Sequence, residues 1–293
     1  KRRNRLIRLE DASIKTAAEL DIGGWVRDDN SDGLVLKPIS VARFGQPYLW
    51  SHAENWLNMS ATIISSEQMS RDIGAGDWSQ LTVSVPMTFP VENRVINFAP
   101  IADMSRAGEE EGGWEVCLTG ICNLLNMHPG ERIVIHAVSY RLTKFITEGI
   151  AAEIARGTVK RRKIISYTSS AMREAAIARY RKTPGAVIVA PSLDRGVDFK
   201  GDDCRVQIIA KVPYPYLGDK QIKARMGLED GQQWYTVKTI RDLVQMTGRG
   251  VRSETDYCTT YILDRGFGRL FDMNKRLIPA WWRAAVNQRF NSK

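Results

Sequence analysis

Apolar residues in the second half of the chain follow two alternating patterns. Continuous runs rich in Val and Ile, such as ERIVIHAV at 131–138 and GAVIVAPS at 185–192, predict strands buried on both faces. Between them, residues 139–155 carry apolar side chains at helical spacing. The same alternation continues through further strands and helices, at 162–168, 169–182, 204–212, 231–250, 257–264 and 269–288. This order predicts an α/β domain, a parallel sheet covered by helices on both faces.

The first third of the chain has weaker periodicity and more turn residues. Residues 25–39 predict two short strands around the turn Asn30–Gly33. Residues 51–64 predict a segment that ends in an apolar strand. Residues 65–74 begin with Ser and end with Gly, which predicts a short helix.

A more irregular stretch links these elements to the alternating region. Residues 75–112 predict short strands at LTVSVPM and RVINFAP, followed by an exposed acidic loop, GEEEGG. Residues 114–128 predict a helix. We therefore divide the chain into an N-terminal extension with lead-in strands, residues 1–48, and a main domain, residues 49–293.

The charge balance favours a polyanionic partner. Lys and Arg total 42 against 33 acidic residues, a formal net charge of +9. Nucleic acid is the first such partner to consider, although a well-solvated basic surface explains the charge equally well. No apolar run approaches the ~20 residues that a membrane helix needs, and the basic start has no apolar core after it. We therefore expect no membrane association and an intracellular, cytoplasmic location.

Cysteine usage and the absence of common motifs exclude several kinds of site. The four cysteines are scattered and include no CxxC pair, so we expect free thiols in a reducing compartment and no metal site. The sequences GxxxxGK[ST], GxSxG and HExxH do not occur, and no GxGxxG follows a strand. The chain therefore lacks a loop that would cradle nucleotide phosphates in the P-loop manner.

The stretch VQMTGRGVRS, residues 244–253, contains two arginines after a predicted helix. If that helix continues at ~100° per residue, Gln245, Arg249 and Arg252 fall on one stripe. A guanidinium is planar and permanently charged, and it binds phosphate oxygens in a bidentate manner. The stripe therefore predicts an anion-binding site. The alternative is a pair of surface arginines in ordinary salt bridges.

Two other segments carry candidate binding residues. In the loop 190–203, Gly196 and Gly201 permit close backbone approach and Asp198 offers an acceptor. We expect this loop at the carboxyl ends of the strands, the usual ligand edge of such a sheet, although an acidic turn is the alternative. Ser139 is expected to cap the following helix, whose free amides could meet a phosphate or could simply be capped.

Taken in order, the motifs resemble a known motor domain. SAT at 60–62, IVIHAVSYRLTKF, SLDRGVDFKGDDCRVQIIAKVPYP and QMTGRGVRSETDYCTTYILDRGF are similar to the second motor domain of superfamily two helicases, within them the XPD/DinG group. The resemblance covers roughly residues 50–275. It departs from the group at Asp194–Arg195, where Trp or Ser followed by Glu is usual, and at Ile63–Ile64, where Leu is usual. It implies a RecA-like parallel sheet flanked by helices, a P-loop NTPase-type fold lacking the P-loop.

The resemblance also implies roles for individual residues. ATP and Mg²⁺ would be held mainly by a P-loop-bearing first motor domain, in cis or in trans, so that this segment alone is inactive. The implied catalytic contacts with the γ-phosphate are Arg252, as the arginine finger, Arg249 and Gln245. The residues implied to couple ATP to movement are Gly196, Asp198, Ser60 and Thr62. The implied nucleic-acid contacts are Ser139, Tyr140, Arg141, Ser192 and Lys211.

The expected partner is single-stranded nucleic acid, DNA first, bound by a monomer. Tyr214 and Tyr216 either stack on bases or pack within their loop, and the basic run at 160–163 either adds affinity or is a solvated surface run. The expected function is the C-terminal motor half of an ATP-dependent DNA helicase. Two alternatives remain: a non-catalytic nucleic-acid-binding module of the same fold, and an unrelated α/β enzyme that binds a phosphorylated metabolite.

Overall fold

The chain forms two compact units. The computed structural model describes residue 8 and residues 24–30, 33–191, 193, 197–199, 201–248 and 250–287. Unit 1 comprises Lys1–Thr82 and Tyr214–Lys238, and unit 2 comprises Val83–Pro213 and Thr239–Lys293. This division does not coincide with the boundary expected after residue 48.

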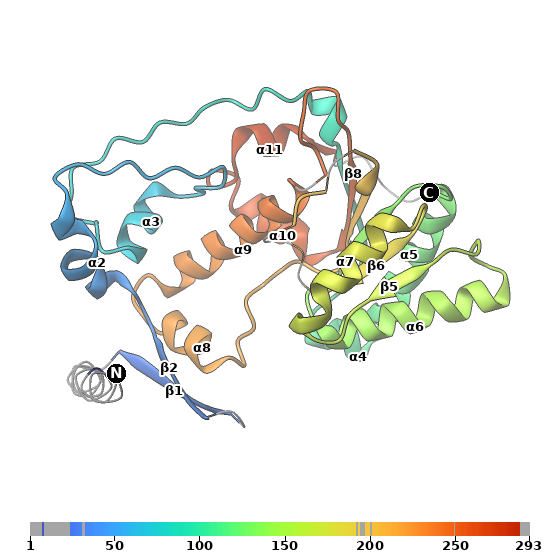
Figure 1. The fold of residues 1–293 in the computed structure, drawn as a ribbon, viewed down its shortest axis with the longest axis horizontal. Coiled ribbons are helices and arrows are strands. Elements are labelled where there is room, and N and C mark those ends of the chain that lie inside the picture. The colour runs from blue at the N-terminus through green and yellow to red at the C-terminus, as the bar shows by residue number, and fades with distance from the viewer. Residues whose placement is uncertain are drawn as a thin grey trace. The chain divides into compact units, whose positions relative to one another are not determined.

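Unit 2 is built on a seven-stranded sheet in the order β5-β6-β4-β7-β8-β3-β9, and every neighbouring pair in it is parallel (Figure 1). The strands are β3 Ile96–Ala102, β4 Ile133–His136, β5 Ile164–Ser166, β6 Val187–Ala190, β7 Val206–Ile209, β8 Thr259–Asp264 and β9 Val286–Asn287. All the strands point the same way, so their amino ends share one edge, the amino edge, and their carboxyl ends share the opposite one, the carboxyl edge. The predicted parallel α/β sheet is confirmed.

Helices cover both faces of this sheet. The helices of unit 2 are α4 Arg106–Glu110, α5 Gly113–Met127, α6 Tyr140–Arg156, α7 Arg173–Lys182, α10 Gly266–Met273 and α11 Ala280–Ala284, with the second half of α9 Gly231–Thr247. Successive strand residues face opposite sides. Ile133 and Ile135 therefore pack in one cluster with α5 and α6, whereas Val134 packs in another with Ile177 and Tyr180 of α7.

Unit 1 is small and rich in turns. It contains the antiparallel hairpin β1 Trp25–Asn30 and β2 Gly33–Pro38, as expected, with α2 Ala42–Tyr48, α3 Ser66–Asp72, α8 Lys220–Met226 and the first half of α9.

A buried ion cluster holds α3 and α8 together. The Arg225 guanidinium donates to Asp72 at 2.9 Å and to Asp230 at 2.7 Å, and it lies 5.1 Å from the centre of the Trp234 ring. Hydrogen bonds from Arg225 lower the pKa of Asp230 to about 2.

Three local expectations are wrong, two strands and one loop. Residues 53–64 and 81–87 contain no strand: Leu57, Leu81 and Val83 are exposed, and no neighbouring strand pairs with these segments in the described residues. An alternating apolar pattern forms a strand only where a partner supplies hydrogen bonds.

The acidic loop expected at GEEEGG is instead mostly helical. Ser105 caps α4 by accepting from Gly108 N at 3.1 Å. Gly112, with φ +84°, separates α4 from α5. A single glycine with positive φ thus makes the turn for which the sequence suggested a whole loop.

Candidate functional site at the amino edge

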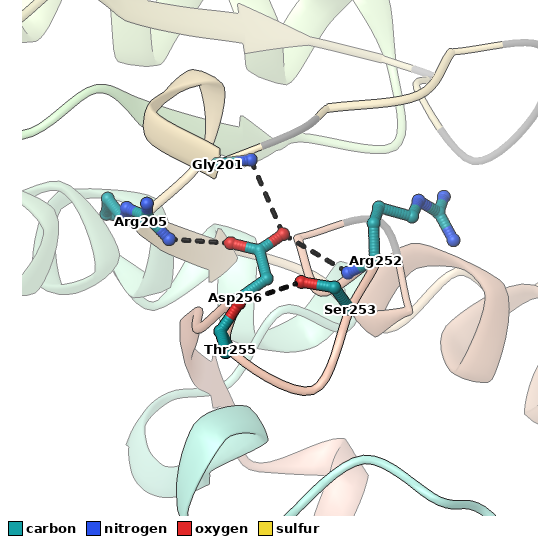
Figure 2. A pocket seen from close by; sticks show the side chains of 6 residues that line it. All are labelled: Gly201, Arg205, Arg252, Ser253, Thr255 and Asp256. Atoms are coloured by element: carbon teal, nitrogen blue, oxygen red, sulfur yellow. Dashed lines mark hydrogen bonds and ion pairs between the residues drawn. The ribbon is translucent and has the colours of Figure 1, made fainter.

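A pocket lies at the amino ends of β7 and β8. It is lined by Gly201, Arg205, Arg252, Ser253, Thr255 and Asp256 (Figure 2). Arg205 immediately precedes β7 and Asp256 lies three residues before β8, and these two strands are neighbours. The parallel pairing therefore brings the end of the loop 191–205 against the segment that follows α9.

Asp256 is the centre of this pocket. Its Oδ2 accepts from the main-chain N of Arg252 at 3.1 Å and from that of Gly201 at 3.4 Å. Its Oδ1 accepts from Arg205 Nη1 at 2.7 Å and from Tyr257 N at 3.0 Å (Figure 2). The side chain is only 7% exposed. One carboxylate thus ties together two loops that are about fifty residues apart in the sequence.

Arg205 is the cation that balances Asp256. Its guanidinium also donates to Asp202 Oδ1 at 2.9 Å and to the carbonyl of Tyr257 at 3.0 Å, and it lies 4.1 Å from the centre of the Tyr257 ring. Burial opposes its charge, but the hydrogen bonds to Asp202 and Asp256 raise the pKa of Arg205 above its ordinary value. Arg205 is therefore a fixed positive charge in the wall of the pocket.

Arg252 presents its side chain away from Asp256, as Figure 2 shows. Its guanidinium pairs with the Asp198 carboxylate, and both side chains remain partly exposed. The structure thus brings together Arg252 and Asp198, two residues the sequence singled out separately. The pocket offers a guanidinium and the hydroxyls of Ser253 and Thr255, a donor set suited to an anion.

Two expectations about this region are wrong. Helix α9 ends at Thr247, so Arg252 follows it in an irregular segment and does not share a helical stripe with Gln245. The loop 190–203 leaves β6 at the carboxyl edge, but Asp198 and Gly201 lie at the amino edge, because the loop must reach the start of β7. Gln245 is half-buried in α9. Arg249, Gly196 and Ser192 lie outside the described residues.

The carboxyl edge carries a second group of predicted residues. Ser139 caps α6: its Oγ accepts from Leu142 N at 3.2 Å. The preceding Val138 has φ +64°, which is strained for a β-branched residue, and Ser139 N donates across it to Ala137 O at 2.8 Å. Lys211 follows the end of β7 at the same edge.

Tyr140 and Arg141 lie in the first turn of α6. The Tyr140 ring is half-exposed and packs edge-to-face on Tyr167 at 6.2 Å between centroids. Arg141 pairs with Glu109, and its guanidinium lies 4.6 Å from the centre of the Trp114 ring. The structure therefore separates the predicted residues of unit 2 into two groups on opposite edges of the sheet.

The coupling residues Ser60 and Thr62 lie in unit 1. They were expected at a strand end, but the structure has a turn there, in which Thr62 N donates to Ser60 Oγ at 3.2 Å.

A buried polar chain links the middle strands to the end of α9. His136 Nε2 lies 3.2 Å from Gln207 Oε1, and Gln207 Nε2 donates to the Thr247 carbonyl at 3.2 Å. Trp282 Nε1 donates to Thr247 Oγ1 at 2.7 Å. Trp282 is buried in the core.

Sequence reasoning missed Asp256 and Arg205. The available signal was Asp256 four residues after Arg252, just before a strand, where a short acidic side chain commonly accepts main-chain hydrogen bonds. Of the two candidate stacking residues, Tyr214 packs parallel to Tyr235 at 6.0 Å, whereas Tyr216 is exposed.

No group of three or more His, Cys, Asp or Glu side chains arranged to hold a metal ion occurs within the described ranges. In that same part of the chain, every helix is too short or too polar to cross a membrane. The cysteines are unpaired, as expected.

The parallel sheet with helices on both faces defines a RecA-like domain. The family model described as "Helicase C-terminal domain" matches residues 121–285. The chain belongs to this family, and it is similar to XPD/DinG-type helicases. This confirms the resemblance expected from the motifs.

Two solved structures have a similar fold. The structure "XPD_Helicase" matches with a TM-score of 0.63 at 14% identity, covering 92% of this chain and 49% of that chain. The structure "XPD_APO" matches with a TM-score of 0.59 at 17% identity, covering 92% of this chain and 54% of that chain.

Among curated proteins, the Fanconi anemia group J protein homolog of Gallus gallus is 29% identical over 96 residues, 28% of this chain and 8% of that protein. The regulator of telomere elongation helicase 1 homolog of Caenorhabditis briggsae is 23% identical over 153 residues, 44% of this chain and 15% of that protein. The chain thus spans less than a sixth of the length of either relative.

Proposed function

We propose that the chain is the C-terminal motor half of an ATP-dependent DNA helicase. In this proposal a first motor domain, in cis or in trans, carries the P-loop and holds most of the ATP and Mg²⁺. Unit 2 supplies arginines to the γ-phosphate from its amino edge and binds single-stranded DNA at its carboxyl edge. The protein would act as a monomer, associated with DNA inside the cell.

The observation that carries this proposal is the setting of Arg252. Its main chain is held by a buried carboxylate, whereas its guanidinium reaches a partly exposed position. A rigid backbone with an accessible guanidinium suits a residue that must meet charge developing on another molecule. Asp198, the present partner of Arg252, would compete with an incoming phosphate and so keep the guanidinium in place until nucleotide binds.

The carboxyl edge suits the backbone of a nucleic-acid strand. The first amides of α6 lie at this edge and Lys211 follows β7 there, and helix N-termini and lysines bind phosphate without reading sequence. Tyr140 and Arg141 begin the same helix. Gln245, Arg249, Gly196, Ser192, Ser60 and Thr62 retain the roles that the family resemblance implies for them, as part of the proposal.

The decisive experiment measures ATP turnover with single-stranded DNA after the chain is combined with a P-loop-bearing first motor domain. We expect Arg252→Ala to lower kcat by about 10³–10⁵. Arg252→Lys should recover little, because an ammonium lacks the planar fork. Arg276→Ala, which removes an exposed arginine after α10, is the matched control and should leave turnover unchanged.

Undiminished turnover in Arg252→Ala would remove the finger assignment. The isolated chain, residues 1–293, should not hydrolyse ATP, and turnover by it would contradict the division of labour proposed here. A combined protein that binds DNA but never hydrolyses ATP would instead be the non-catalytic module.

A further inference from the structure

A second basic surface lies on unit 2, at the amino edge, beside the loop that carries Asp198: Arg181, in the last turn of α7, donates to the Asp198 carbonyl at 2.6 Å. It consists of Arg161, Lys163, Arg179 and Lys182, called here the α7 patch. The first two belong to the lead into β5, one of the two edge strands of the sheet, and the other two to the last turn of α7.

Strand alternation places Arg161 and Lys163 on the α7 side of the sheet. Lys163 already pairs with β6, since its carbonyl accepts from Val187 N at 2.9 Å. Residues two apart on a strand share a face, so Arg161 and Lys163 lie on the same side as Ile165, which packs against α7. Arg162 points the other way.

Arg162, between Arg161 and Lys163, uses its charged group inside the fold. Its guanidinium donates to four main-chain carbonyls, those of Leu125, His128, Glu131 and Gly185. Arg162 is therefore structural, and the basic run 160–163 is not one uniform solvated surface.

The end of α7 reaches the same edge. The helix begins after the carboxyl end of β5 and ends before β6, so its last turn lies at the amino edge. Arg179 and Lys182 are three residues apart and share one side of the helix. Ala186 N donates to Thr183 O, which keeps the helix end close to the start of β6.

The four side chains are exposed cations without an ion pair among the described residues. Their neighbours differ: Arg181 and Arg132 both pair with Asp203 at 3.4 Å. Asp203, which lies beside the end of α7, is thus already shared by two arginines. The patch therefore presents four positive charges that are available to bind a partner molecule.

We propose that the α7 patch binds the phosphate backbone of a second nucleic-acid segment. Guanidinium and ammonium groups at the surface suit repeated phosphates, and the net charge of +9 points the same way. The strand proposed for Ser139 and Lys211 runs at the opposite edge, so it cannot occupy this one. Strand β5 is three strands from β7, about 14 Å at ~4.8 Å per strand, and none of the four patch residues lines the pocket of Arg252. The patch therefore flanks that pocket without being part of it.

The test uses the chain itself and fluorescence anisotropy with labelled DNA, either a single strand of about 20 nucleotides or a duplex of similar length. The variant carries Arg161→Gln, Lys163→Gln, Arg179→Gln and Lys182→Gln. The matched control removes four exposed charges elsewhere on unit 2: Arg269→Gln, Lys275→Gln, Arg276→Gln and Arg283→Gln. Thermal melting of both variants checks that each is folded.

For single strands, each lost phosphate contact lowers the slope of log K against log salt by about 0.7, so we expect the patch variant to lose up to about 3 from that slope. The control should keep the slope of the unaltered chain. Equal slopes in the two variants would overturn the inference, as would binding by the unaltered chain that no salt concentration weakens. A greater loss with duplex than with single-strand DNA identifies the second segment as duplex, and the reverse identifies it as a single strand.

A fifth substitution separates this inference from the proposed function. Lys211→Gln should weaken single-strand binding through the carboxyl edge, additively with the patch variant. If Lys211→Gln weakens binding and the patch variant matches its control, the patch is refuted and the carboxyl-edge path stands. If only the patch variant weakens binding, the patch stands and the path proposed for the first strand is wrong.

Discussion

Removing the Asp256 carboxylate should destabilise unit 2 far more than removing an exposed carboxylate bound to the same arginine. Asp256→Ala leaves the Arg205 guanidinium, 16% exposed, without its most buried partner. Breaking a buried pair by removing one member costs about 3–5 kcal/mol. Arg205 keeps Asp202 and the Tyr257 carbonyl, and water can reach the amides of Gly201 and Arg252 at the pocket. We therefore expect the lower end, about 3 kcal/mol.

The measurement is thermal unfolding followed by calorimetry. A loss of about 3 kcal/mol corresponds to a Tm lower by about 6–12 °C for a unit of this size. The control is Asp202→Ala, whose carboxylate is 86% exposed and bonds the same guanidinium; it should cost less than about 1 kcal/mol. If both variants lose the same stability, or if Asp256→Ala loses less than about 1 kcal/mol, burial does not set the strength of this cluster and the reasoning fails.

Three further predictions concern other parts of the chain. Asp230 has a folded pKa of about 2, below its ordinary value, so its ion pair with Arg225 stabilises unit 1 above about pH 4 and is lost as pH falls through 2. A plot of Tm against pH should show this loss of stability in acid, and Asp230→Asn should abolish it. Ser139→Ala should cost about 1 kcal/mol in urea unfolding through the lost α6 cap, whereas Ser139→Asp should keep the cap and still weaken DNA binding in anisotropy; unchanged binding by the Asp variant would remove Ser139 from the proposed path. Gly250→Ala would place a Cβ 2.4 Å from Cys258 Sγ and should destabilise the fold by about 1–3 kcal/mol in urea titration; a neutral result would mean that this segment can shift.

The alternating half of the sequence predicted the sheet because each strand there is buried on both faces. Residues 133–136, 187–190 and 206–209 are apolar or fully buried throughout, and such runs carry their own signal. The two-residue β9 has no such signal, because it exists only through pairing with β3. The apolar alternation at 81–87 failed for the converse reason: the signal is present, but among the described residues no strand pairs with it.

The candidate site was predictable in its residue types but not in its geometry. Arg252 and Asp198 were each identified from their motifs, yet their placement depends on where α9 ends and on which edge the loop 190–203 reaches. The parallel order of β7 and β8 decides both points, because it brings two separate loops to one edge. Asp256 escaped notice because its place before a strand suggests main-chain hydrogen bonds but does not say which amides it binds, and those of Gly201 and Arg252 come from separate loops.

The orientation of the buried Gln207 side-chain amide determines which ring nitrogen of His136 carries a hydrogen. The Thr247 carbonyl can only accept, so the Gln207 group 3.2 Å from it must be the NH₂. The Gln207 oxygen then faces His136, and the ring nitrogen 3.2 Å away, Nε2, must carry a hydrogen. The tautomer of a histidine in β4 is thus dictated by the last residue of α9. Nitrogen NMR of the His136 imidazole would show whether Nε2 carries the hydrogen. It would therefore report whether the end of α9 stays in place.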